Sequence, residues 1–480
     1  MTGGQNFWDF SVWNLMIELT ILLVGMLTAN MLRRLIKPLR QSLIPSAVLG
    51  GFLILFANLA YENIAGYSLF NNVTMETLTY HGLGLGFVAV ALKVSDKKHS
   101  KTARRDIFNA GLTTVSSYLL QGLLGLAITI GFFYAIGSWA SSGLLLPMGY
   151  GQGPGQAYNW GHIYATATQY PAFQNGTSFG LTIAALGFVS AGLGGVIYLN
   201  IMKRKGRIKP GIVDADEAED LTAHVITKKG EIPMSESLDK LTVQIGLVFF
   251  TYMAAYVLMR LISLGLDSSG NNFLIGTVKP LIWGFNFLIG TVLAILLKRI
   301  LGRLQDHGII KRQYINNFML SRISGVMFDI MVVASIAAID LTAFAHREFI
   351  LPLVVVCLVG AAATFLQLRF ISKRLFPNYQ DEAFLSMFGM LTGTASTGVI
   401  LVREIDPAFE TPAANNLIYQ QLWAIVFGFP MLLLLGFAPL SMGNTWLTLG
   451  ALAVLFIIIN MILFRRQIFG SRKAKGAGIS

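Results

Sequence analysis

The sequence predicts an all-α polytopic membrane protein with about 11 transmembrane helices. Charged residues make up 12% of the 480 residues, about half of the ~25% typical of soluble proteins. Apolar residues make up 54%, and they gather in runs of about 20 residues, the length that an α-helix needs to cross a hydrocarbon core. One stretch of 96 residues, 107–202, has no Lys, Arg, Asp or Glu. Because a charge at the centre of a bilayer costs at least ~2.5 kcal/mol, such a stretch is typical of a membrane interior.

The apolar runs set the expected helices in chain order. They lie at 11–32, 44–60, 78–92, 107–136, 180–202, 241–264, 280–297, 319–341, 350–368, 417–437 and 446–464. Between the fifth and sixth runs lies the only sizeable hydrophilic segment, 203–240. It is too short for a domain, so we interpret it as a linker.

The Lys and Arg residues predict the orientation of these helices. Of the 36 basic residues, 33 fall on one side of the membrane, and only Arg260, Lys279 and Arg347 fall on the other. By the positive-inside rule the first side is cytoplasmic, which places the N-terminus outside and the C-terminus in the cytoplasm. Topology therefore explains the net charge of +12, and we expect no nucleic-acid partner. The single cysteine, Cys357, excludes an intrachain disulfide.

Two apolar stretches are interrupted by glycine, proline or hydroxyl residues. The first, near 139–160, contains GYGQGPGQ from Gly149 to Gln156, and the second, near 383–402, contains LTGTASTG from Leu391 to Gly398. Arg105 and Lys203 are both cytoplasmic, and helices 107–136 and 180–202 supply the two crossings between them, so the first stretch must enter from outside and return. Arg374 and Arg403, on either side of the second stretch, are both cytoplasmic, so that stretch must enter from the cytoplasm and return. We expect two re-entrant hairpins, the first from outside and the second from the cytoplasm.

The two halves of the chain then match. Each has four helices, a hairpin and a fifth helix, and the two halves begin on opposite sides of the membrane. This pattern predicts two inverted five-helix repeats, 11–202 and 241–438, joined by the linker 203–240 and followed by an additional C-terminal helix at 446–464.

The hairpin tips are the predicted substrate site. Glycine amides and the N-termini of half-helices carry partial positive charge, which suits a carboxylate. The alternative is a tight turn between short packing helices. The residues expected at the substrate are Gly151, Gln152, Gly153, Gly155, Gln156, Asn159, Thr394, Ser396 and Thr397.

A coupling cation is expected at Asp329, Thr392 and Thr394. Asp329 lies near the middle of 319–341, where no Lys or Arg is at hand to pair with it. Its carboxyl must therefore be protonated, hydrogen-bonded, hydrated or bound to a cation. Hydroxyl and carbonyl oxygens are ligands of hard cations and, by extension, of Na⁺. The alternatives are a protonated structural carboxyl for Asp329 and hydroxyls bonded back to their own helix; we expect no other metal.

Four further features receive structural interpretations. His162 and Asp340 are expected near the outer surface, and Arg403 is expected as an interfacial anchor. Glycines in 180–202, among them Gly187, let helices approach closely in lipid.

Interrupted hydrophobic segments are typical of secondary transporters. We expect no enzyme, because Asp329 and Asp340 share one predicted helix and no Ser–His pair lies at membrane depth. The absence of a nucleotide-binding motif argues against an ATP-driven pump. A channel is the alternative, since half-helices from opposite faces also form pores.

The chain resembles the bacterial sodium/glutamate symporter family over most of 15–438, as a divergent member with an extra C-terminal helix. The resemblance rests on IPSAVLGG at 44–51, on 84–92, on GFVSAGLGG at 187–195 and on both interrupted stretches. It implies a homodimer in the bacterial inner membrane, in which a domain with both hairpins moves like an elevator against a dimerising scaffold. It also implies symport of Na⁺ with glutamate or a related amino acid or carboxylate, and no cofactor besides the ion.

The chain departs from this family at its tips and at one carboxylate. The family's tips usually run Gly-Gly-x-Gly, whereas here they are GYGQGPG and TGTASTG. Asp329 has no matching carboxylate in the best-known members of that family. An H⁺-coupled carboxylate transporter therefore stands as the alternative function.

Overall fold

The chain is built from α-helices. The computed structural model describes residues 6–94, 100–206, 239–272, 274–407 and 409–468, and these contain no β-strand. Nine of the described helices are long and apolar enough to span a membrane, or ten if one bent pair counts as a single span. The prediction of an all-α polytopic membrane protein is confirmed to that extent, whereas the eleven spans and the repeats stay predictions. Most of the predicted linker, 207–238, lies outside the described residues.

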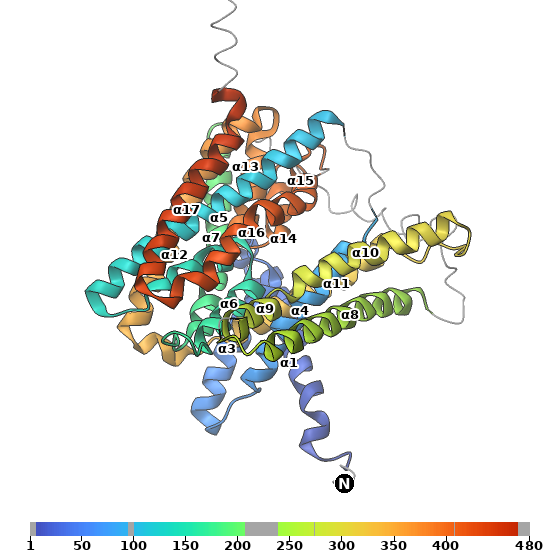
Figure 1. Ribbon diagram of the computed structural model, residues 1–480, viewed down its shortest axis with the longest axis vertical. Coiled ribbons are helices and arrows are strands. Elements are labelled where there is room, and N and C mark those ends of the chain that lie inside the picture. Colours follow the sequence, from blue (N-terminus) through green and yellow to red (C-terminus); the bar gives the residue numbers. More distant parts are fainter. Residues whose placement is uncertain (1–5, 95–99, 207–238, 273, 408, 469–480) are drawn as a thin grey trace, which may run out of the picture. The chain divides into compact units, whose positions relative to one another are not determined.

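Figure 1 shows the helices, coloured along the sequence. By their contacts they divide into two compact units. Of the described residues, unit 1 comprises 6–32, 46–94, 239–272 and 274–338, and unit 2 comprises 33–45, 100–206, 339–407 and 409–468. Each unit therefore combines segments from both halves of the sequence.

Unit 1 contains the first three predicted helices and the first three of the second half. They are α1 (Phe10–Leu35, which belongs to this unit through Leu32), α3 (Ser46–Ala65), α4 (Asn72–Leu92), α8 (Lys240–Ser268), η4 (Leu274–Val278), α9 (Lys279–Gly284), α10 (Asn286–Asp306) and α11 (Asn317–Ala337). Helices α4 and α11 pack in antiparallel directions. At one end, Lys93 Nζ donates to Ser321 Oγ at 3.0 Å. Toward the other end, Gly82 leaves room for Met331, whose Cβ would lie 3.0 Å from a Cβ added to the glycine.

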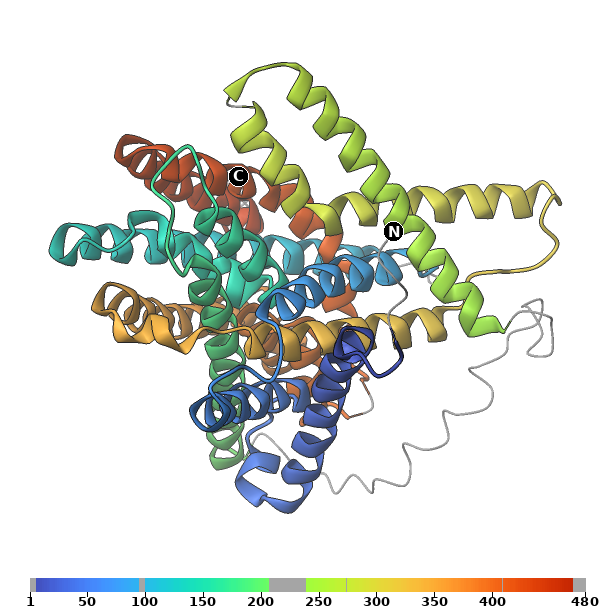
Figure 2. The ribbon, with the colours of Figure 1, turned by 90° about the horizontal axis from the view of Figure 1, so that it is seen from below.

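The helix predicted at 280–297 is wrong as a single element. The structure instead has the segment Leu274–Gly284, which ends with α9, bent by 58° from α10 (Figure 2). A buried and a half-buried side chain bind the backbone groups that the break leaves without helical partners. The Asn286 side-chain oxygen accepts from the Phe287 amide at 2.6 Å, and the Tyr80 hydroxyl donates to the Trp283 carbonyl at 2.8 Å. The break is thus held by tertiary contacts.

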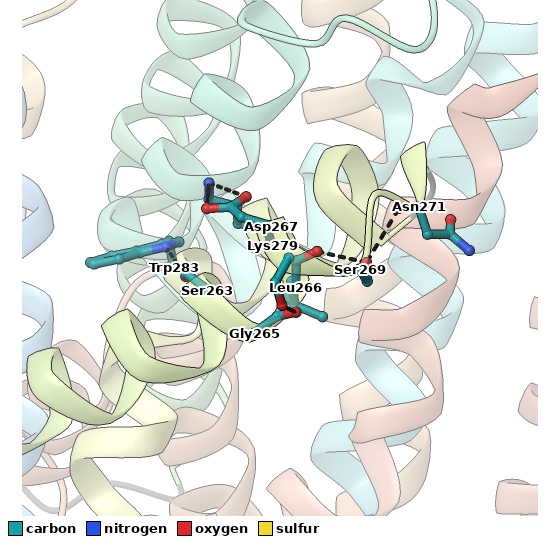
Figure 3. A network of polar contacts seen from close by, with 9 residues as sticks. Ser263, Gly265, Leu266, Asp267, Ser269, Asn271, Lys279 and Trp283 are labelled. Atoms are coloured by element: carbon teal, nitrogen blue, oxygen red, sulfur yellow. Dashed lines mark hydrogen bonds and ion pairs between the residues drawn. The ribbon is translucent and has the colours of Figure 1, made fainter.

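The turn from α8 into α9 is fixed by polar contacts (Figure 3). Lys279 Nζ lies 2.8 Å from both carboxylate oxygens of Asp267, and Trp283 Nε1 donates to Ser263 Oγ at 2.9 Å. Both pairs join the last turns of α8 to α9. The α9 segment is thereby held against the end of α8.

Unit 2 contains both interrupted stretches. Its elements are α2 (Lys37–Gln41), α5 (Lys101–Ile136), η1 (Ala140–Leu144), η2 (Pro147–Gly151), α6 (Pro154–Ala165), α7 (Gly176–Arg204), η5 (Leu341–Ala345), α12 (Arg347–Leu375), η6 (Pro377–Tyr379), α13 (Gln380–Thr392), α14 (Ala395–Arg403), α15 (Ala413–Tyr419), α16 (Gln421–Phe437), η7 (Ala438–Leu440) and α17 (Met442–Leu463). The predicted 417–437 helix is thus divided between α15 and α16 at Gln420. The predicted 319–341 helix ends at Ala337.

Helices α5 and α12 run antiparallel, and this sets the direction of both interrupted stretches. Gln121 of α5 donates to Thr364 of α12 at 2.9 Å, whereas Asp106, near the start of α5, accepts from Tyr379, just beyond α12, also at 2.9 Å. The C-terminus of α5, where the first stretch begins, therefore lies at the opposite end of unit 2 from the C-terminus of α12, where the second begins.

The last helix, α17, is an integral part of unit 2. It packs along α5, where Ser116 Oγ donates to Asn460 Oδ1 at 3.1 Å, and its start contacts η1, where the hydroxyls of Ser141 and Thr445 lie 3.4 Å apart. The same Ser116 accepts from Gln367 of α12 at 2.9 Å. These bonds join α5, α12 and α17.

Candidate functional site

The first interrupted stretch forms a helical hairpin through η1, η2 and α6. Its break lies at Gly153, whose φ of 85° and ψ of −177° suit glycine alone. Pro154 then starts α6, where a missing amide hydrogen costs nothing. The stretch returns to its starting point, because the ring of Trp139 lies 4.8 Å from that of Tyr164 at the far end of α6.

The second interrupted stretch forms a hairpin from α13 and α14. The two helices approach so closely that a Cβ on Gly389 would lie 2.7 Å from the Cα of Gly398. The break lies at Gly393 and Thr394, between the end of α13 and the start of α14. Glycine on both helices is therefore what permits this tight return.

The two tips meet inside unit 2. A Cβ on Gly153 would lie 3.4 Å from Thr394 Cγ2 and 3.7 Å from the carbonyl oxygen of Gly393. Helices α6 and α14 both begin here. The N-cap residue of α6 is Gly153, which has no side chain, and the side chain of Thr394, the N-cap residue of α14, makes no capping hydrogen bond. The first amides of both helices thus bring partial positive charge to one place.

Gln156, in the first turn of α6, is the clearest sign of a ligand. Its side chain is 1% exposed, and neither its oxygen nor its nitrogen has a hydrogen-bond partner among the described residues. Buried polar atoms are nearly always paired, so this amide is suited to a molecule that brings both a donor and an acceptor.

Two residues of α5 support the tips, and sequence reasoning missed both. The Tyr118 hydroxyl donates to the Gly151 carbonyl at 3.0 Å. Gln121 Nε2 donates to the Leu391 carbonyl and to Thr364 Oγ1, each at 2.9 Å. The signal that could have found Gln121 is its amide side chain within the charge-free stretch 107–202.

The structure gathers the predicted substrate residues at the tips. Gly151, Gly153, Gly155, Gln156, Asn159 and Thr397 are buried, Gln152 and Thr394 are half-buried, and Ser396 is exposed. The hydroxyls of Thr394 and Thr397 lie 3.3 Å apart.

The predicted cation residues are divided between the units. Thr392 is at the second tip, but its hydroxyl donates back to the Phe388 carbonyl at 2.7 Å. Asp329 lies on α11 of unit 1, on an exposed face of that helix. Its part in a cation site stays a prediction.

The remaining singled-out residues have structural positions. His162 is exposed, and Arg403 ends α14 with its guanidinium 5.8 Å from the Phe409 ring centre. Asp340 caps η5, accepting from the Thr342 amide at 2.9 Å. Gly187 lies directly against the Thr392 carbonyl, so the glycine of α7 permits close packing on the second tip.

Polar contacts also fix the base of the second hairpin. Burial and the Asp106 carboxylate raise the pKa of the Tyr379 hydroxyl. The hydroxyl therefore stays protonated and donates a hydrogen bond to Asp106. Asp381, in the first turn of α13, accepts from Tyr198 at 2.5 Å and from Arg369 at 3.1 Å. These bonds connect the hairpin base to α5, α7 and α12.

Comparison with known proteins adds no relative. No protein-family model and no curated protein matches the chain.

Proposed function

We propose that the protein is a secondary active transporter, a symporter that couples Na⁺ to glutamate or a related amino acid or carboxylate. The observation that carries the proposal is the meeting of two broken-helix tips beside a buried Gln156 whose side-chain amide has no partner among the described residues. Interrupted helices whose N-termini converge are suited to an anionic substrate. The enzyme and pump alternatives have no comparable support.

An elevator mechanism is supported by the division of the chain. Both hairpins belong to unit 2, so a single compact body holds the proposed substrate site. In this proposal unit 2 carries the substrate and unit 1 is the dimerising scaffold, in the inner membrane of a bacterium. The two hairpins then correspond to the re-entrant segments of the two inverted repeats.

The test is uptake into proteoliposomes that contain the full chain. We expect labelled glutamate or a related carboxylate, from a panel of amino acids and dicarboxylates, to accumulate under an inward Na⁺ gradient, and unlabelled substrate inside to accelerate its entry. Accumulation under a pH gradient alone would instead support the H⁺-coupled alternative. Flux that is not accelerated from the far side would identify a channel and contradict the proposal.

A matched pair of variants tests the site itself. Gln156→Met removes the partnerless amide and should weaken substrate affinity at least about 10-fold, as expected for a lost hydrogen bond to a charged group. Gln367→Met makes the same chemical change away from the tips, and its substrate affinity should stay near that of the wild type. Equal effects of both variants would exclude Gln156 from the site.

A further inference from the structure

A second unpaired oxygen lies beside the tips, on Gln121 of α5. The Gln121 side chain is 1% exposed, and its Oε1 atom has no hydrogen-bond partner among the described residues. A Cβ built on Gly151 would lie 3.3 Å from this oxygen. The oxygen is thus desolvated and adjacent to the first tip.

The orientation of the Gln121 amide is fixed by its neighbours. Nε2 donates to the Leu391 carbonyl, which can only accept, so the reversed amide would set two oxygens against each other. Thr364 Oγ1 accepts the second bond from Nε2, and a hydroxyl is compatible with this orientation. The unpaired atom is therefore an acceptor, and only a cation or a donor group can satisfy it.

The local backbone favours a cation. Leu391 belongs to the last turn of α13, whose final carbonyls have no partner within the helix and carry partial negative charge. Gln121 Oε1 belongs to the same amide group as the Nε2 that contacts the Leu391 carbonyl, so it places one more oxygen near this carbonyl end, on the side of Gly151. The amide ends of α6 and α14 lie across the break. Oxygen ligands of this kind suit a hard cation.

We infer that Gln121 Oε1 is a ligand of the coupling cation, a small monovalent ion held at the carbonyl end of α13. This inference rests on the proposed function and names a residue for its ion. Because Gln121 contacts α12 and α13 and lies beside Gly151, a bound ion fixes both tips. Ion binding thereby raises the affinity for the substrate, and the substrate raises that for the ion.

The experiment measures thermal stability of the purified full chain as NaCl replaces KCl at constant ionic strength, together with substrate affinity in proteoliposomes. Gln121→Met keeps the length of the side chain but removes the oxygen. It should raise the Na⁺ concentration for half-maximal stabilisation roughly 10- to 100-fold. Substrate affinity should return to within about threefold of the wild type at saturating Na⁺.

Two further variants complete the test. Gln367→Met is the matched control, because Gln367 also has a buried unpaired oxygen but bonds Ser116 away from the tips; its Na⁺ dependence should be unchanged. Gln121→Glu retains an oxygen at the same reach, and its protonated carboxyl can still donate to the Leu391 carbonyl, so it should keep a Na⁺ dependence at least as strong as that of the wild type, even where the Met variant does not fold.

The possible failures are distinct. The inference would be overturned if Gln121→Met kept the Na⁺ dependence of the wild type, or if a folded Gln121→Glu lost its Na⁺ dependence. Either result would leave the proposed function standing. Weaker substrate binding at saturating Na⁺ with unchanged Na⁺ affinity would assign the oxygen to a substrate ammonium and also overturn it. A wild-type protein that neither responds to a cation nor accumulates substrate would contradict the proposed function itself.

Discussion

At the scale of single residues, Gly153 determines how the first tip is formed. Its backbone lies in a region that side-chain-bearing residues pay about 1–3 kcal/mol to occupy. Gly153→Ala should therefore lower the free energy of unfolding by that amount and reduce substrate affinity, because the new methyl group also meets Thr394. Gly131→Ala, at a glycine of α5 with open space around it, should be neutral or slightly stabilising. Thermal unfolding and uptake measure both, and equal stability of the two variants would contradict the prediction.

A second prediction for a single residue concerns the charge of Asp329. If the carboxylate binds the coupling cation, Asp329→Asn keeps its shape and should cost ~1.5–3 kcal/mol, or about 10- to 150-fold in ion affinity. If it is instead a proton site, the variant should lose pH dependence and keep Na⁺ dependence. Asp306→Asn, at the exposed end of α10, is the control. Nearly normal ion-coupled transport by Asp329→Asn would remove Asp329 from the mechanism.

At the scale of elements, the base of the second hairpin depends on Asp381. The Arg369–Asp381 pair is mostly buried, with 21% and 14% of the side chains exposed, and Tyr198 donates to the same carboxylate oxygen. Asp381→Asn leaves Arg369 without its counter-charge, so it should lower the melting temperature and cost up to about 3–5 kcal/mol.

The control for Asp381 is the exposed pair Arg347–Glu348, whose side chains are 74% and 43% exposed. Glu348→Gln should leave the melting temperature close to that of the wild type, because an ion pair in solvent contributes little to stability. Comparable melting temperatures for the two variants would show that the hairpin base does not depend on the Asp381 pair.

Elements defined by local composition could be predicted from the sequence. The apolar runs gave most of the helices, and the glycine and proline residues gave both hairpin breaks. The break before Asn286 could not be predicted, because the hydroxyl that holds its side chain, on Tyr252, lies 34 residues away. The position of Gln121 at the tips could not be predicted for the same reason, since its partners Thr364 and Leu391 are 243 and 270 residues away in the sequence.

At the scale of the whole molecule, the division into units follows from contacts that no local pattern contains. The two successive inverted repeats stay a prediction, and the contacts show in addition that each compact unit combines segments from both halves. Because α5 and α12 are antiparallel, the two hairpins start at opposite ends of unit 2, and their tips meet between those ends. In the proposed transporter, those ends face opposite sides of the membrane.

The sidedness of the hairpin bases tests this central claim most directly. In a Cys357→Ser background, one cysteine replaces exposed Gln174, after the first hairpin, and another replaces exposed Asn378, before the second. A membrane-impermeant thiol reagent should label Gln174→Cys in intact cells, and Asn378→Cys only after the membrane is permeabilised; the background protein should stay unlabelled. Labelling of both positions from the same side would contradict hairpins that enter from opposite faces.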